Sequence, residues 1–366
     1  MRVLICTPYN SSPEVVQSGI GVWARNIVEY YDSISSTIEL TIIPFDRVTR
    51  VDSKMSFISR CISGAKEYSH HIKKTSKILK QGGYDVIHLC TSASISLLKD
   101  YYLLCKARRL GIKTVVHFHF GRIPDLYNNR NWEWKILVRV ISVADRTIVM
   151  DIQSYNVLKE RYTSVFYLPN PLSLKVKSFI NYRKNIINRE PNRVLFVGHV
   201  IPTKGIFELL EACKGIPGIE LHIVGHVTPE ILREVKERLV GDQHWLIFHG
   251  EIPHERVITE MLLSGIFALP TYTEGFPNVI IEAMACGCSI VTTPVGAIPE
   301  MLDIYGDEPC GLVSAPKEVE SLRNNIGYLY KNVHAAKVFS ERAISRVNRL
   351  YSVNVVWDAL TNIWES

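Results

Sequence analysis

The stretch LPTYTEGFPNVIIEAMACGCSIVTTPVGAIPE, residues 269–300, decides the fold class. An apolar run ends at Pro270, a polar loop with a glycine follows, and a helical pattern starts near Asn278. A second apolar run covers residues 288–293. Strand, helix and strand in this order are typical of a βαβ unit, whose two strands lie parallel.

The same alternation extends over most of the chain. Helical patterns such as residues 21–31, 97–110, 206–214 and 229–240 separate short apolar runs that we read as strands. These runs are residues 2–7, 38–44, 85–90, 113–118 and 146–150, and later 193–198, 218–225, 245–250, 265–270, 288–293 and 310–313. The pattern predicts an α/β protein with two facing, doubly wound parallel-sheet domains of the Rossmann-like kind.

A proline-rich polar segment divides the two halves. Residues 171–192 are expected to be a linker between a first domain, residues 1–170, and a second, residues 193–351. The last helical pattern, residues 352–366, is expected to cross back to the first domain. Ligands of such sheets bind outside the carboxyl ends of the strands, so the informative residues should follow the strands.

Composition sets the class of protein. Of 366 residues, 47% are hydrophobic and 21% charged, as in a globular protein. The eight cysteines are scattered without a CxxC pair, which gives no sign of a zinc ribbon. We find neither a signal peptide core nor a spanning segment, and therefore expect a cytoplasmic protein.

One segment carries as much net charge as the whole chain. Residues 54–80 hold seven basic side chains and one acid, a net +6, and the chain is also +6. Apolar residues recur there at helical spacing, which predicts a basic amphipathic helix. Two interpretations stay open: peripheral contact with an anionic membrane, or a solvated helix whose apolar stripe packs on its own domain.

The loop and helix start in the opening stretch suit a nucleotide sugar. Amides at the start of the helix, around Phe276, Pro277, Asn278 and Val279, can bind a diphosphate, and Gly275 allows close backbone approach. Two carboxylates complete the site: Glu274 can accept hydrogen bonds from sugar hydroxyls, and Glu282 can bind both ribose hydroxyls.

Three further loops follow strands of the second half. FVGHVIPTKG, residues 196–205, offers Gly198 for close approach and Lys204 as a cation for phosphate oxygens. HIVGHVTPE, residues 222–230, places Gly225 after a strand, and FHGEIPHERV, residues 248–257, places Gly250 and Glu251 likewise. Ordinary loop glycines are the alternative interpretation of the last two.

The first half has two candidate loops. PYNSSPEVVQSGIGVWARNIV, residues 8–28, would bring Ser18, Gly19 and Gly21 to the start of a helix that faces a diphosphate. KTVVHFHFGR, residues 113–122, ends a strand, and alternation sends His117 and His119 to one face. No third ligand for a metal is evident beside these histidines.

Together these motifs resemble the family 4 glycosyltransferases, which are retaining enzymes of the GT-B fold. The signature is EGFPNVIIEAMACG followed by VGAIPE, joined by the Lys204–Gly205 pair. The resemblance implies Lys204, Glu274 and His119 as catalytic residues, His117 on the acceptor side, and the loops named above as the donor site. His199 stands where the family usually has an arginine, so either it binds phosphate or another basic residue does.

The resemblance also implies the chemistry. A hexose or N-acetylhexosamine would pass from a UDP- or GDP-sugar to a glycan or lipid-linked acceptor, in surface polysaccharide biosynthesis. No metal or other cofactor is expected, and no Asp-x-Asp motif occurs. A nucleotide-sugar epimerase and a non-catalytic nucleotide-sugar-binding protein remain alternatives. A dehydrogenase and a nucleic-acid binder are less well supported, because the glycine fingerprint is partial and the basic segment lacks interleaved aromatics.

Overall fold

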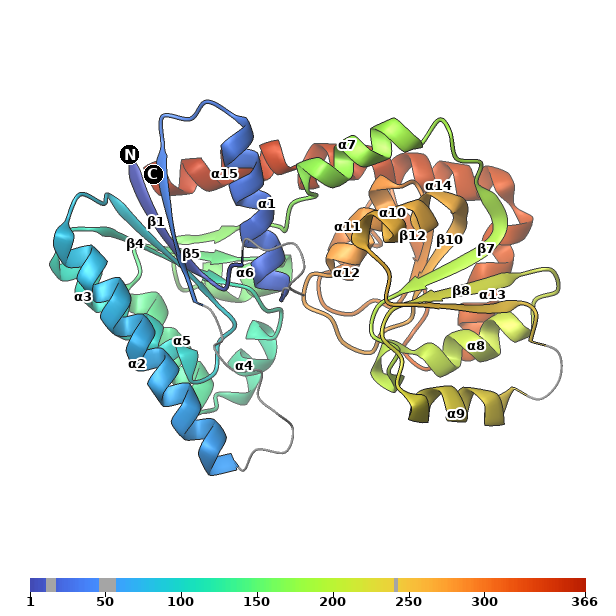
Figure 1. Cartoon of the computed structure of the whole chain (residues 1–366), viewed down its shortest axis with the longest axis horizontal. Coiled ribbons are helices and arrows are strands. Elements are labelled where there is room, and N and C mark those ends of the chain that lie inside the picture. The colour runs from blue at the N-terminus through green and yellow to red at the C-terminus, as the bar shows by residue number, and fades with distance from the viewer. Residues whose placement is uncertain (11–17, 46–56, 240–242) are drawn as a thin grey trace. The chain divides into compact units, whose positions relative to one another are not determined.

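The chain forms two compact α/β units. The computed structural model describes residues 1–10, 18–45, 57–239 and 243–366, with the backbone alone for residues 57–65. One unit comprises Met1–Pro171 with Val353–Ser366, and the other Leu172–Ser352. Each contains one six-stranded sheet (Figure 1). The predicted fold class is confirmed, including the return of the last helix to the first unit.

All strand pairs of the first unit are parallel, in the order β2-β1-β3-β4-β5-β6. β1 and β4 have the predicted bounds, whereas the three-residue β6 was not predicted. The strands are β1 (Arg2–Thr7), β2 (Glu39–Pro44), β3 (Val86–Thr91), β4 (Lys113–Phe118), β5 (Arg146–Val149) and β6 (Val165–Tyr167).

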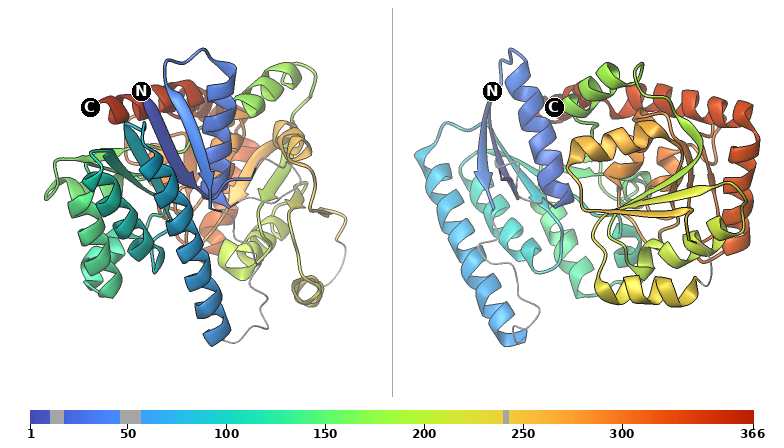
Figure 2. Two further views of the ribbon diagram at one scale, coloured as in Figure 1. Left: turned by 60° about the vertical axis from the view of Figure 1, so that its left-hand side comes forward. Right: turned by 45° about the vertical axis from the view of Figure 1, so that its right-hand side comes forward.

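Alternation along these strands builds a core on each face of the sheet. Leu4 and Ile87 face α2 (Phe57–Gln81), α3 (Ser96–Arg109) and α5 (Trp132–Val143), whereas Val3 faces α1 (Gly19–Ser33) and α15 (Val353–Glu365). Figures 1 and 2 show these two layers. The remaining helices of the unit are α4 (Ile123–Asn129) and α6 (Ile152–Lys159).

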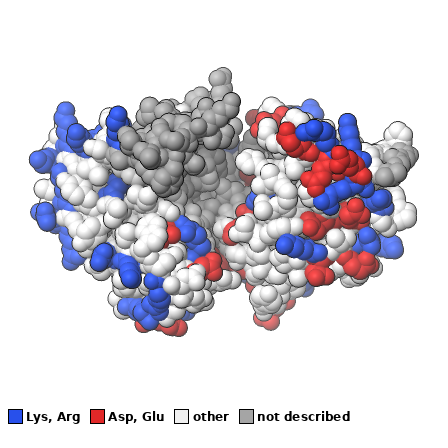
Figure 3. Space-filling model, turned by 90° about the horizontal axis from the view of Figure 1, so that it is seen from below, with Lys and Arg blue, Asp and Glu red and all other residues white. Residues whose placement is uncertain are grey.

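Helix α2 carries most of the basic segment. Leu79 and Thr75 are buried, whereas the lysines of the described turns are exposed, namely Lys66, Lys73, Lys74, Lys77 and Lys80. The apolar stripe of these turns therefore packs on its own unit. Lys54 and the side chains of residues 57–65 lie outside the described part. In Figure 3, the half of the surface that holds the first unit shows many Lys and Arg and few Asp and Glu, whereas the other half shows both kinds.

The second unit repeats the design with the order β12-β11-β10-β7-β8-β9, all parallel. Most of its strands lie within a residue or two of their predicted bounds, although β7 begins three residues early. They are β7 (Glu190–Val197), β8 (Glu220–Val224), β9 (Leu246–Gly250), β10 (Ser264–Leu269), β11 (Ser289–Thr292) and β12 (Gly311–Val313).

Helices cover both faces of this sheet as well (Figure 1). One layer holds α8 (Ile206–Lys214), α9 (Pro229–Arg238) and α13 (Val319–Lys331), and the other holds α10 (His254–Leu263), α11 (Asn278–Ala285) and α14 (Val333–Arg346). A short α12 (Ile298–Met301) follows β11. No helix among the described residues is both long and apolar enough to span a membrane.

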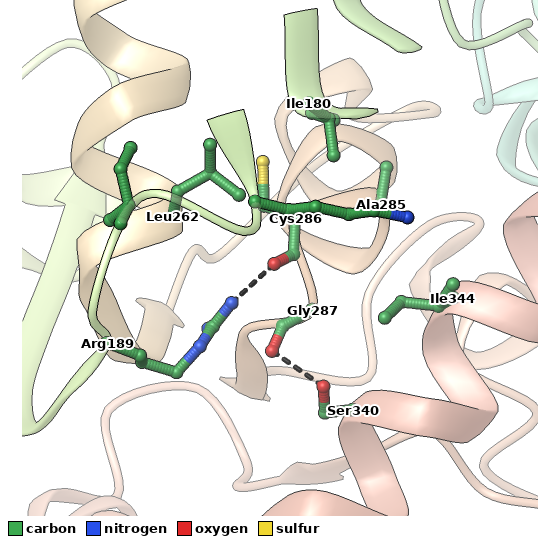
Figure 4. Close-up of a pocket in the computed structure, with 10 residues that line it drawn as sticks. Ile180, Arg189, Leu262, Ala285, Cys286, Gly287, Ser340 and Ile344 are labelled. Atoms are coloured by element: carbon green, nitrogen blue, oxygen red, sulfur yellow. Dashed lines mark hydrogen bonds between the residues drawn. The ribbon is translucent and has the colours of Figure 1, made fainter. Parts of the chain in front are cut away.

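Residues 171–192 differ from the expected linker. They contain α7 (Leu174–Arg183), which Ser173 caps by accepting a hydrogen bond from the Val176 amide at 3.5 Å. The helix packs on α10 and α11, and Ile180 faces a small cavity with Leu262 and Ala285 (Figure 4). The prolines of this segment, Pro171 and Pro191, lie on either side of the helix, where they do not break it.

Candidate functional site

The strand order of the second unit shows where its site should lie. The chain leaves β7 toward β8 and β9, and then returns to pair β10 on the other side of β7. Ligands of doubly wound sheets bind where the strand order reverses, at the carboxyl ends. Lys204 follows β7 and Glu274 follows β10, so these two residues lie on either side of the reversal.

Lys204 and Glu274 form a partly buried ion pair, Nζ to Oε1. Their loops are joined by the backbone: the Tyr272 amide donates to the Thr203 carbonyl at 2.9 Å. Gly205 has φ +71°, and a Cβ there would lie 2.0 Å from the Pro270 carbonyl oxygen. The close approach of these loops therefore fixes the backbone that carries Lys204.

The Glu274 loop is held from its other side by the residues after β11. The Ala297 amide donates to the Gly275 carbonyl at 2.9 Å. Gly296 has φ +56°, and a Cβ on it would lie 2.2 Å from the Glu274 carbonyl oxygen. Glu274 thus sits on a loop that is braced by both neighbouring strand ends, which is what precise positioning of a ligand requires.

The predicted glycines at the ends of β7, β8 and β9 lie close together. The Gly198 amide donates to Val224, and the Gly225 amide donates to Gly250 at 2.9 Å. A Cβ on Gly225 would lie 1.9 Å from the Gly198 carbonyl oxygen. His199 is exposed in this group. Exposed Glu251 lies 3.6 Å from His226, between Oε2 and Nδ1.

Helix α11 begins directly after the Glu274 loop. Pro277 is its N-cap residue and provides no capping side chain. The amides of Asn278 and Val279 form the first turn, where a helix favours an anion. The Phe276 side chain is buried and packs against Tyr351, at 5.8 Å between ring centroids. Only the backbone of Phe276 is therefore available to a ligand.

Glu282, one turn into α11, has a partner that sequence reasoning missed. His254, the first residue of α10, lies with Nε2 2.9 Å from Glu282 Oε1. The Glu282 side chain is 16% exposed and that of His254 is 58% exposed, so the pair is accessible from one side. The contact joins residues 28 positions apart, and no motif in the sequence indicates it.

In the first unit, Ser18 caps α1. Its Oγ accepts a hydrogen bond from the Gly21 amide at 3.3 Å. Ser18 and Gly19 are exposed, and no atom of the described residues lies within 4 Å of the place where a Cβ of Gly19 would be. Residues 11–17 of the predicted glycine loop lie outside the described part.

His117 and His119 lie together at the end of β4, as strand alternation predicts. Their ring centroids are 3.8 Å apart, and Trp23 of α1 contacts both at 5.0 Å. Burial lowers the pKa of His119 to about 3, with a smaller effect of His88. Burial, then His119 and His88, lower the pKa of His117 well below its usual range. Both rings are therefore neutral at neutral pH.

His88 has a structural role in the first unit. It is fully buried, its Nδ1 accepts a hydrogen bond from the Trp364 indole at 3.0 Å, and its ring stacks on Trp23. Burial lowers the pKa of His88 to about 3. The bond joins β3 to α15 and so fixes the returning helix on the first unit.

These neutral histidines predict acid sensitivity. The unfolded chain takes up protons below about pH 6.5, whereas the folded one does not until about pH 3, so stability is lost as pH falls through this window. Each histidine contributes up to about 1.4 kcal/mol per pH unit. Urea unfolding of the chain and of His119→Gln at about pH 7 and about pH 5.5 measures this. If the free energy of unfolding fell by the same amount between the two pH values in both proteins, the role of His119 in this acid sensitivity would be contradicted.

A comparison with known families identifies the second unit. Residues 178–346 match the family Glycosyl transferases group 1. The match lies within the second unit, and there the chain is similar to this family. The matched region holds Lys204, Glu274 and Glu282, and the resemblance inferred from the motifs is thereby confirmed.

Individual relatives of this family cover part of the chain. The D-inositol 3-phosphate glycosyltransferase of Mycobacteroides abscessus is 31% identical over 157 residues, 41% of this chain and 34% of the relative. The capsular polysaccharide biosynthesis glycosyltransferase CapM of Staphylococcus aureus is 26% identical over 179 residues, 47% of this chain and 45% of the relative. This chain spans about a third to a half of the first curated relatives it matches.

A solved structure covers nearly all of the chain. HepE of Anabaena, in complex with UDP, superposes with a TM-score of 0.70 and 15% identity over 99% of each chain. At this identity the likeness concerns the fold, which is the expected GT-B architecture.

Proposed function

We propose that this chain is a retaining glycosyltransferase. It transfers a hexose or N-acetylhexosamine from a UDP- or GDP-sugar to a glycan or lipid-linked acceptor in surface polysaccharide biosynthesis. One observation carries the proposal: Lys204 and Glu274 lie at the strand ends beside the reversal of the sheet, directly before the α11 helix start. A cation, a carboxylate and helix amides in one place suit a diphosphate joined to a sugar.

The diphosphate is the leaving group. In this proposal Lys204 exchanges Glu274 for phosphate oxygens, and the amides of Asn278 and Val279 add partial positive charge. Ser18, Gly19 and Gly21 at the start of α1 are kept as further proposed donor-binding residues, as the resemblance to the family implies. Stabilising charge that develops on the leaving group is the largest expected effect. The proposed reaction uses no metal cofactor.

The sugar is held by Glu274 once Lys204 has moved to the diphosphate. In this proposal neutral His119 forms a hydrogen bond with a sugar hydroxyl, either as donor or as acceptor. His117 is assigned to the acceptor side. The bond from the anomeric carbon to the phosphate oxygen breaks, and a bond to the acceptor oxygen forms on the same face. The acceptor proton passes to the departing diphosphate.

Donor and acceptor classes have indirect support. HepE, which shares the fold, binds UDP, and CapM is named for capsular polysaccharide biosynthesis. A lipid-linked acceptor would lie at a membrane, and the exposed lysines of α2 form a cationic surface suited to anionic lipid.

The binding test is a thermal-shift screen of the chain against UDP- and GDP-sugars. A bound donor raises the melting temperature. The best donor is then incubated with and without a glycan acceptor. Transfer that requires the acceptor supports the proposal. Isomerised donor without acceptor would identify an epimerase, and binding without turnover would identify a binding protein.

The ribose contact makes a separate prediction. Glu282→Ala should weaken donor binding by about ten- to a hundredfold, because a hydrogen-bonded charged group is worth about 1.5–3 kcal/mol. His254→Ala should weaken it less, since His254 only orients the carboxylate. Calorimetric Kd values measure both effects, and exposed Glu234→Ala on α9 serves as the control. Unchanged Kd for Glu282→Ala would remove Glu282 from the site.

The membrane contact is tested with vesicles. The chain should sediment with vesicles that contain anionic lipid and not with neutral ones, and binding should fall as salt rises. Changing Lys73, Lys74 and Lys77 to glutamine should cost about 1 kcal/mol of binding per lysine. A chain that ignores anionic vesicles would refute the membrane contact without touching the sugar-transfer proposal.

A further inference from the structure

A cluster of histidine and glutamate in the second unit has no role in the proposed reaction. His222 on β8, His249 on β9 and Glu260 on α10 bring three potential ligand atoms within 4.8 Å of one another. We propose that these three residues form a binding site for a divalent transition-metal ion such as Zn²⁺. The site is separate from the sugar-transfer chemistry and does not depend on it.

The geometry fits such an ion with small shifts. His222 Nδ1 lies 2.9 Å from His249 Nε2, and the same His249 nitrogen lies 3.9 Å from Glu260 Oε2. Two nitrogens bound at about 2.0 Å to a tetrahedral zinc are about 3.3 Å apart. An ion between the rings therefore replaces their hydrogen bond and requires a movement of a few tenths of an ångström. Two histidines and a carboxylate form a known transition-metal ligand set.

A second carboxylate, that of Glu220, lies close to the other ring nitrogen of His222. His222 is 6% exposed, and its Nε2 lies 3.5 Å from Glu220 Oε2. Metal-binding histidines usually direct their second nitrogen at a carboxylate, which fixes the ring and the tautomer. With Nε2 directed at Glu220, Nδ1 is the nitrogen that faces His249 and the proposed ion.

The local charge favours a dication despite one nearby cation. Arg193 pairs with Glu260 and also lies 3.3 Å from Glu190. The carboxylates Glu190, Glu220 and Glu260 outweigh the Arg193 guanidinium, and these four side chains together carry a net charge of −2. If Glu260 leaves Arg193 to bind the ion, Arg193 retains its ion pair with Glu190. The His249 side chain is 21% exposed, which provides an entry path.

The other cluster of potential ligands is unsuitable. His88, Cys90 and His117 also lie close together in the first unit. The Trp364 indole donates to His88 Nδ1, so in neutral His88 the proton is on Nε2, the only nitrogen left for an ion. A protonated nitrogen cannot be a ligand. His222 has no such conflict, because its Nε2 faces a carboxylate.

The position of the ion indicates its use. It would join β8, β9 and α10, and α10 begins with His254, the partner of Glu282. β9 ends at Gly250, whose carbonyl binds Gly225. A bound ion would thus stabilise the framework around these loops as a structural site.

The experiment uses the full chain, freed of metal by a chelator and titrated with Zn²⁺ by calorimetry. We expect one ion per chain with micromolar or tighter affinity, and a rise in melting temperature with zinc. Co²⁺ in the same site should give visible d–d absorption that Zn²⁺ abolishes. His249→Gln should lose this binding, and Glu220→Gln should weaken it by about 10- to 100-fold. His334→Gln, an exposed histidine on α14, is the matched control.

Two results would overturn the site. The first is the absence of stoichiometric zinc binding in the unaltered chain. The second is equal affinity in the chain and in His249→Gln, with circular dichroism showing that the variant is folded. If His249→Gln does not fold, Glu220→Gln decides, because Glu220 is half exposed and its loss leaves the ligands in place.

Discussion

Lys204→Met is expected to lower kcat by about 100- to 1000-fold, the range observed when one group that stabilises a developing anion is removed. Methionine keeps the length and the apolar stem of the side chain and removes only the charge. In the proposed reaction that charge meets the diphosphate as it leaves, so the loss should fall on kcat more than on KM.

Initial rates over a range of donor concentrations measure this effect. Lys214→Met removes an exposed lysine at the end of α8 and is the matched control. A thermal melt shows whether the loss of the Lys204–Glu274 pair disturbs folding. Turnover by Lys204→Met equal to that of the control variant would mean that Lys204 does not bind the leaving group.

Gly205→Ala adds a single methyl group to the Lys204 loop. We expect it to lower stability and kcat more than the addition of a methyl group at any other position of this loop. The new Cβ would lie 2.0 Å from the Pro270 carbonyl oxygen. Because both contacting groups belong to the backbone, neither segment can move away without a large cost in energy. Gly205 also has φ +71°, which costs an alanine about 1–2 kcal/mol. The displaced loop should misplace Lys204, so that both stability and kcat fall.

A glycine with the same backbone strain and open surroundings separates the two causes. Gly111 has φ +73° and no atom within 4 Å of its would-be Cβ. Gly111→Ala should lose only the stability that the positive φ costs an alanine, and it should keep full turnover. Urea unfolding and initial rates compare the variants. Similar losses in both would show that the approach of Gly205 to Pro270 is not tight in solution.

The sequence predicted much of the fold because parallel strands buried on both faces leave uninterrupted apolar runs. β1 and β4 have the predicted bounds for this reason, and the helix α8 has the bounds predicted from its helical spacing. The three-residue β6 was missed, whereas the equally short β12 was predicted. α7 was taken for a linker because prolines and polar residues on both sides of it dominate the local composition. The packing of the helix on α10 and α11 is a tertiary effect that the local sequence does not show.

The site was predictable only where it follows strands. The pairing of Lys204 with Glu274 agrees with their places beside the sheet reversal, and alternation put His117 and His119 on one face. His254 could not be found, since no local pattern connects it to Glu282. Phe276 belongs to a recognisable motif, but the direction of its side chain depends on Tyr351, which lies far along the chain.

The central claim is that Lys204 leaves Glu274 to bind a diphosphate beside the start of α11. A crystal structure of the chain with the nucleoside diphosphate that raises its melting temperature most tests this directly. We expect phosphate oxygens within hydrogen-bonding distance of Lys204 Nζ and of the Asn278 and Val279 amides, with the ribose on Glu282. A nucleotide bound elsewhere, with the Lys204–Glu274 pair intact, would contradict the claim.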